Sequence, residues 1–104
     1  PGVLAMHNRP DAIFAVNDDT AIGVLHTAKR MGLSVPADLM ICGFTNGFRA
    51  IACDPMLTTV EQRGVEVGRE AANILIDKVE GLTDPDKVEK RVGKTRLVVR
   101  GSSK

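Results

Sequence analysis

The sequence is poor in aromatic residues: it has no tryptophan and no tyrosine, and only the three phenylalanines Phe14, Phe44 and Phe48. The core must therefore be packed from valine, isoleucine, leucine, alanine and methionine. The charged stretch from Lys87 to Arg100 also lacks the interleaved aromatic residues on which nucleic-acid bases stack. We interpret it as a solvated edge strand protected by lysines rather than as a nucleic-acid patch.

Clustered cysteines, long apolar runs and an excess of one charge are also missing. Cys42 and Cys53 have neither a CxxC pattern nor metal-ligand spacing, so we expect buried free thiols in a reducing cytoplasm rather than a disulfide. No apolar run approaches the roughly 18 residues that span a bilayer, and no signal peptide is visible. The formal net charge of +1 predicts no electrostatic partner by itself.

Catalytic constellations are scarce as well. His7 and His26 are far apart, and the few serines lie in a loop and in the C-terminal tail, without a GxSxG motif. Asp18 and Asp19 are adjacent and would diverge at a helix start, which makes them poor partners for acid–base chemistry. No phosphate-binding glycine loop and no metal-ligand cluster occurs. We expect no catalytic residue, no metal and no cofactor.

What the sequence does contain is an alternation of short apolar runs with helical patterns. The runs at 12–16 and 39–44 are typical of parallel strands that are buried on both faces. The stretch between them predicts a helix to about Met31, stopped by Gly32. Strand, helix and strand form a βαβ unit. The fold class that this predicts is α/β, with a parallel sheet flanked by helices.

The remaining segments are assigned from shorter patterns. In chain order we expect the last turns of a helix at 2–8, loops at 33–38 and 45–54, an extended segment at 57–61, a helix at 63–80 stopped by Gly81, a turn at 83–86, strands at 87–92 and 95–100, and a frayed tail at 101–104.

Two polar clusters fall where the two apolar strands end. Asn17, Asp18 and Asp19 follow the first strand, and Thr45 and Asn46 follow the second. In open parallel sheets, ligands bind outside the carboxyl ends of the strands. Amide and carboxylate groups offer the donors and acceptors that a polyhydroxyl ligand needs. From the residues alone, however, simple capping by Asp18 or Asp19 and a simple turn at Thr45 are the stronger interpretation.

The run from Pro10 to Phe44, PDAIFAVNDDTAIGVLHTAKRMGLSVPADLMICGF, resembles the hallmark segment of LacI/GalR transcription regulators. That segment reads P-x-A-I-F-x-x-N-D-x-x-A-x-G, then a helix, then G-x-x-V-P-x-D-x-x-x-x-G-[FY]-D. Residues 54–62 are similar to the family's P-x-L-T-T-V-x-Q, and residues 97–102 to its L-V-x-R-x-S. The resemblance covers nearly the whole chain. It implies a periplasmic-binding-protein-like type I (Rossmann-like) sensor, in which two α/β subdomains enclose a ligand cleft.

The resemblance also implies a domain organisation. Residues 1–104 would be a fragment of the effector-binding and dimerisation domain, with the DNA-binding helix-turn-helix lying N-terminal to it and absent from these residues. Residues 1–59 and 87–101 would belong to the C-terminal subdomain, and the helix at 63–81 to the N-terminal one. Because that helix would lack its usual cover, we expect it to associate with another copy or to pack elsewhere.

Roles for single residues follow from the resemblance too. The residues implied to bind the effector are Asn17, Asp18, Thr45, Asn46 and Gln62. Thr45 stands where the family has an aspartate that grips effector hydroxyls, and a lost charge-assisted hydrogen bond is worth about 1.5–3 kcal/mol. The residues implied for a dimer interface are Thr20, Ile22, Val24, His26, Thr27, Phe48, Arg49 and Cys53, with plain intramolecular packing as the alternative.

The function we expect is effector sensing and dimerisation in a cytoplasmic LacI-family transcription regulator, a repressor that binds a sugar or related metabolite. Its partners would be the effector, a second copy and, through the helix-turn-helix alone, operator DNA, with no membrane involved. The alternatives are a periplasmic sugar-binding component of a transporter and a small α/β enzyme. Val35-Pro36-x-Asp38 and Leu57-Thr58-Thr59 favour the regulator, and the lack of a nucleophile–base pair argues against the enzyme.

Overall fold

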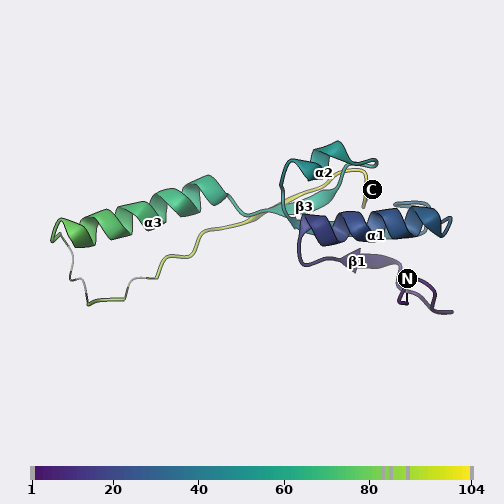
Figure 1. The fold of residues 1–104 in the computed structure, drawn as a ribbon, viewed down its shortest axis with the longest axis horizontal. Helices are drawn as coiled ribbons and strands as arrows, with labels where there is room; N and C mark the ends of the chain where they lie inside the picture. Colours follow the sequence, from purple (N-terminus) through teal and green to yellow (C-terminus); the bar gives the residue numbers. More distant parts are fainter. Residues whose placement is uncertain (1, 83, 85, 89, 104) are drawn as a thin grey trace. The chain divides into compact units, whose positions relative to one another are not determined.

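The computed structural model describes residues 2–82, 84, 86–88 and 90–103 (Figure 1). The chain divides into two compact units, of which the first contains residues 1–62 and 96–104 and the second residues 63–95. The subdomain assignment that the resemblance implies stays a prediction. In the described part of the chain, no helix is long and apolar enough to cross a membrane.

Four strands form the sheet of the first unit: β1 (Ala12–Phe14), β2 (Met40–Thr45), β3 (Thr58–Glu61) and β4 (Arg96–Val98), in that spatial order. β1 and β3 both pair with β2 in parallel, whereas β4 pairs with β3 antiparallel. This confirms the expected α/β class with a mostly parallel sheet. The expectation that the first strand is buried on both faces is wrong, because Ala12 and Phe14 on one face of β1 are exposed, whereas Ile13 on the other face packs against the core.

Helix α1 (Asp18–Arg30) links β1 to β2 and packs on the sheet, as the apolar spacing predicts. It ends where expected: Gly32 adopts a φ of +79°, and the N–H groups of Gly32 and Leu33 donate to the carbonyls of Lys29 and Ala28. This is a Schellman motif, in which glycine supplies the left-handed conformation without steric cost. The aliphatic core contains Leu4, Ala15, Ala21, Leu25, Ala28, Leu39, Ile41, Ala50 and Leu57.

The second unit contains helix α3 (Gly64–Val79), which confirms the predicted helix at 63–80. It ends in the same way as α1, with Gly81 at a φ of +77°. None of its residues is buried, and the apolar side chains of Val65, Leu75 and Val79 are exposed. The amphipathic pattern is therefore real, but nothing within the described part of this unit covers the apolar face.

Three assignments outside the βαβ unit are wrong. Residues 2–8 form hydrogen-bonded turns instead of a helix end. The predicted loop at 45–54 contains the short helix α2 (Arg49–Ala52). Among the described residues of 87–92 there is no strand, since that stretch has no neighbouring strand with which to form a ladder. The predicted turn at 83–86 lies partly outside the described residues.

The C-terminal segment is packed, contrary to the expectation of a frayed tail. Ser102 is fully buried. Its Oγ donates to the carbonyl of Ile41 at 2.6 Å and accepts from the N–H of Thr58 at 2.8 Å. Its main chain also donates to the carbonyl of Met56 and accepts from the N–H of Ile41. Ser102 thus joins β2 and β3 just before their own ladder begins at Cys42 and Thr58.

Candidate functional site

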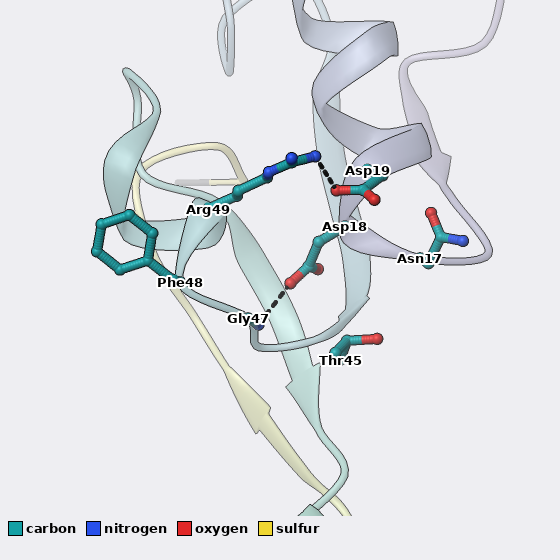
Figure 2. A pocket seen from close by; sticks show the side chains of 7 residues that line it. All are labelled: Asn17, Asp18, Asp19, Thr45, Gly47, Phe48 and Arg49. Carbon is teal, nitrogen blue, oxygen red and sulfur yellow. Dashed lines mark hydrogen bonds and ion pairs between the residues drawn. The ribbon is translucent and has the colours of Figure 1, made fainter.

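The parallel strands bring the two predicted polar clusters to one edge of the sheet. Asn17 follows β1, and Thr45 is the last residue of the neighbouring β2. Together with Asp18 they line an open pocket of about 500 Å³. Its other lining residues are Asp19, Gly47, Phe48 and Arg49 (Figure 2). Three of the five predicted effector-binding residues therefore meet at one pocket.

Helix α1 begins at this pocket, and its first residues divide two tasks between them. Asn17 is the residue that caps the helix, because its Oδ1 accepts a hydrogen bond from the N–H of Thr20 at 2.8 Å. The expectation that Asp18 or Asp19 caps the helix is thus wrong, because the capping residue is Asn17. Asp19 instead pairs with Arg49 at 2.8 Å. Both of these side chains are about 70% exposed, so the pair contributes little, on the order of 0–1 kcal/mol.

Asp18 lines the pocket, but both oxygens of its carboxylate accept hydrogen bonds from groups of the protein itself. The residue is only 5% exposed. Its Oδ1 accepts from the hydroxyl of Thr59 at 2.6 Å, and its Oδ2 accepts from the N–H of Gly47 at 2.8 Å. Gly43 of β2 lies against it so closely that an added Cβ would stand 2.4 Å from Oδ1. The carboxylate thus sits in a space that only glycine at position 43 leaves open.

Thr45 and Asn46 diverge after the end of β2. The Thr45 side chain is exposed and lines the pocket, whereas Asn46 is not among the lining residues. The Oδ1 of Asn46 instead accepts from the guanidinium of Arg100 at 2.9 Å. Gln62 follows Glu61, the residue paired with Thr45, but it is exposed and does not line the pocket either. Asn46 and Gln62 stay predictions as effector contacts, without support from this pocket.

The residues predicted for a dimer interface lie on α1 and around α2. Phe48 is 80% exposed, and Thr20, His26 and Arg49 are exposed as well. Ile22 and Thr27 are half-buried. Val24 and Cys53 pack against the core, which favours the intramolecular alternative for these two.

Both cysteines are free, as expected, but they are partly buried rather than buried. Burial, and then the negative charge of Asp18, raise the pKa of the Cys42 thiol above its ordinary value. Among the described residues, no group of three or more histidine, cysteine or acidic side chains could hold a metal ion.

Sequence reasoning missed two residues that shape the site. Thr59 hydrogen-bonds to Asp18, and Arg100 holds the Asn46 side chain. Both residues belong to motifs that resemble the family's, but their partners are distant in sequence, so the motifs did not indicate these two contacts.

Comparison with known proteins extends over the same length of chain. Residues 2–103 match the family described as periplasmic binding protein-like domain. The transcriptional repressor CytR of Escherichia coli strain K12 is 40% identical over 102 residues, which are 98% of this chain and 29% of the repressor. The arabinose metabolism transcriptional repressor of Geobacillus stearothermophilus is 38% identical over 96 residues, 92% of this chain and 26% of that protein. The chain thus spans less than a third of the length of these curated relatives.

Solved structures with the same fold include two with bound sugars. A LacI-family regulator from Arthrobacter sp. FB24, in complex with lactose, has a TM-score of 0.85 at 33% identity and covers 94% of this chain and 36% of its own. A LacI-family regulator from Enterococcus faecium, with bound ribose, has a TM-score of 0.82 at 31% identity. The match covers 98% of this chain and 37% of that regulator. All four relatives are named as transcription regulators, which supports the expectation of a protein that is not an enzyme. The chain therefore belongs to the periplasmic binding protein-like domain family, in the form found in LacI-family transcription regulators.

Proposed function

We propose that the chain is the effector-sensing part of a LacI-family transcription repressor and that it binds a sugar or related metabolite at the pocket lined by Asn17, Asp18 and Thr45. The observation that supports this is the meeting of Asn17 and Thr45 at the carboxyl edge of parallel strands, the usual ligand position in such sheets. Relatives of the same fold hold lactose and ribose.

The free groups of the pocket suit a neutral polyhydroxyl ligand. The Oδ1 of Asn17 is occupied by the helix cap, so its amide offers mainly the two N–H donors of Nδ2. The Thr45 hydroxyl both donates and accepts, which matches a sugar hydroxyl without the charge that an aspartate would bring. Since two carboxylates and one guanidinium line the pocket, an anionic ligand would meet net repulsion.

The binding proposal is tested by thermal unfolding with lactose, cellobiose, ribose and nucleobases. A ligand at 100 times its Kd stabilises the folded state by about 2.7 kcal/mol and raises Tm accordingly. Asn17→Asp keeps the oxygen that caps the helix but replaces the amide donors, so it should abolish the ligand-induced shift and leave the unliganded Tm nearly unchanged. Ser34→Ala, in a loop away from the pocket, should behave as the wild type in its response to ligand. A wild-type Tm that none of these compounds moves would contradict the proposal.

We also propose that the exposed sides of α1 and α2 form a homodimer interface. Phe48 carries the argument, since a large apolar side chain that is 80% exposed is costly to leave in water. Phe48→Glu should convert a dimer to a monomer in light scattering after gel filtration. Met6→Glu, at an apolar but separate exposed position, should not change the mass. An unchanged dimer in Phe48→Glu would place the interface elsewhere.

In the full-length protein, the effector would act on DNA binding through its different affinities for two conformational states. The DNA contacts would come from a helix-turn-helix outside this chain. A gel-shift titration of operator DNA with and without the effector tests this step. The repressors among the relatives favour this function over sugar transport. In a transport protein, ligand binding would not change any affinity for DNA.

A further inference from the structure

The backbone that carries Thr45 into the pocket is in a conformation that side-chain-bearing residues rarely adopt. Thr45 has a φ of 134° and Asn46 a φ of 59°. A β-branched residue at positive φ is a genuine outlier, and such residues persist only where the surrounding structure holds them in place. The turn from Thr45 to Gly47 therefore needs a support, and that support determines where the Thr45 hydroxyl points.

Two buried side chains from neighbouring elements supply it. Asp18, at the start of α1, accepts from the N–H of Gly47 at 2.8 Å (Figure 2). Thr59, in β3, accepts from the N–H of Asn46 at 3.2 Å, and its hydroxyl donates to the Oδ1 of Asp18 at 2.6 Å. Two consecutive main-chain amides of the turn are thus tied to one carboxylate, one directly and one through a hydroxyl.

We propose that Asp18 and Thr59 are positioning residues, which fix the Thr45–Gly47 turn so that the Thr45 hydroxyl faces the effector. The inference rests on the proposed function of this pocket. Both residues are buried, and each oxygen of the Asp18 carboxylate already has a partner within the protein, which suits a support better than a ligand contact. The carboxylate is required because both partners are donors, and an ionised acceptor makes the shorter and stronger bonds.

The packing of β2 is adapted to the same arrangement. A Cβ at position 43 would come within 2.4 Å of the Asp18 Oδ1 and 3.0 Å of a methyl carbon of Leu57. Asp18, at the start of α1, therefore lies against β2 and β3, and a swing of its carboxylate toward the pocket would break the hydrogen bond to Thr59 or to Gly47. A displaced carboxylate would release the turn.

The experiment compares three variants of the full-length protein with the wild type. Thr59→Val keeps the shape of threonine but removes the hydroxyl, Thr59→Ser restores the hydroxyl, and Asp18→Asn puts an amide donor where two donors already point. Hydrogen exchange of the Asn46 and Gly47 amides is measured without ligand. Calorimetric titrations with lactose and with ribose measure the Kd.

In Thr59→Val and Asp18→Asn, we expect the Asn46 and Gly47 amides to exchange at least about tenfold faster, relative to amides of the β1–β2 ladder, and the Kd to rise by a similar factor. Thr59→Ser should recover both values. A general loss of stability would instead accelerate the hydrogen exchange of all amides together. Thr59→Val and Asp18→Asn each test the inference separately, so a result from one is sufficient if the other fails to fold.

Unchanged exchange of these two amides would overturn the inference, and so would faster exchange with an unaltered Kd. If neither sugar binds the wild type, the proposed sugar-sensing function fails, while the exchange measurement still decides whether Asp18 and Thr59 hold the turn.

Discussion

Ser102 is the residue whose removal should reveal how the first unit is closed. Its hydroxyl is the partner of two buried main-chain groups, the carbonyl of Ile41 and the N–H of Thr58. Ser102→Ala leaves both without that partner, and each unsatisfied buried group costs about 1–3 kcal/mol, so the expected loss is about 2–6 kcal/mol. A small domain has a total unfolding free energy of about 5–15 kcal/mol, so this single oxygen atom accounts for a large share of it.

The loss is measured by urea unfolding followed by far-ultraviolet circular dichroism, because the chain has no tryptophan or tyrosine for fluorescence. Ser34→Ala removes the same hydroxyl group from an exposed loop position and should change stability by no more than about 0.5 kcal/mol. The reasoning is refuted if the two variants unfold at the same urea concentration. That result would mean that the C-terminal segment lies on the sheet without holding it.

Three further predictions concern the site. Gly43→Ala should lower the free energy of unfolding by about 1–3 kcal/mol, because the added Cβ would stand 2.4 Å from the Asp18 carboxylate. Gly23→Ala, with open space around the added Cβ, should be neutral or stabilising. Equal stabilities of the two variants in urea would refute the close contact. Asn17→Ala should lower the free energy of unfolding by about 1 kcal/mol through loss of the helix cap, whereas Asn17→Asp keeps the capping oxygen. A similar decrease of Tm in both variants would argue against capping by Asn17. Cys42 should react with iodoacetamide more slowly than glutathione at pH 8, since its raised pKa keeps the thiol protonated, and its rate should still increase above pH 9.0, the ordinary pKa of a cysteine. A rate equal to that of glutathione would contradict the burial of this thiol.

The elements that the sequence predicted well are those whose signals are local. Helix α1 carries its own apolar spacing and its own terminating glycine at position 32, so its limits needed no knowledge of the rest of the chain. The segment around Ser102 carries no such signal. Its small polar residues are typical of a loose end, and it is ordered only because Ile41, Met56 and Thr58 offer partners far away in the sequence.

The same distinction separates the two halves of the site. That Asn17 and Thr45 meet follows from two parallel strands that end side by side, which the sequence could indicate. That Asn46 turns away could not be predicted, because it depends on Arg100, which lies 54 residues further along the chain. The role of Asp18 likewise depends on Thr59, on a strand that follows 41 residues later. Side-chain orientation at a strand end is decided by long-range hydrogen bonds, and one sequence does not reveal them.

The antiparallel pairing of β3 with β4 makes the second unit an insertion with adjacent ends. The chain leaves the sheet after Glu61 and returns at Arg96, directly opposite, where the two side chains form an ion pair at 2.9 Å. A two-residue turn is enough to connect antiparallel neighbours. Residues 62–95 are thus exchangeable in principle for a simple hairpin connection, and the remaining continuous module would still contain every residue that lines the pocket.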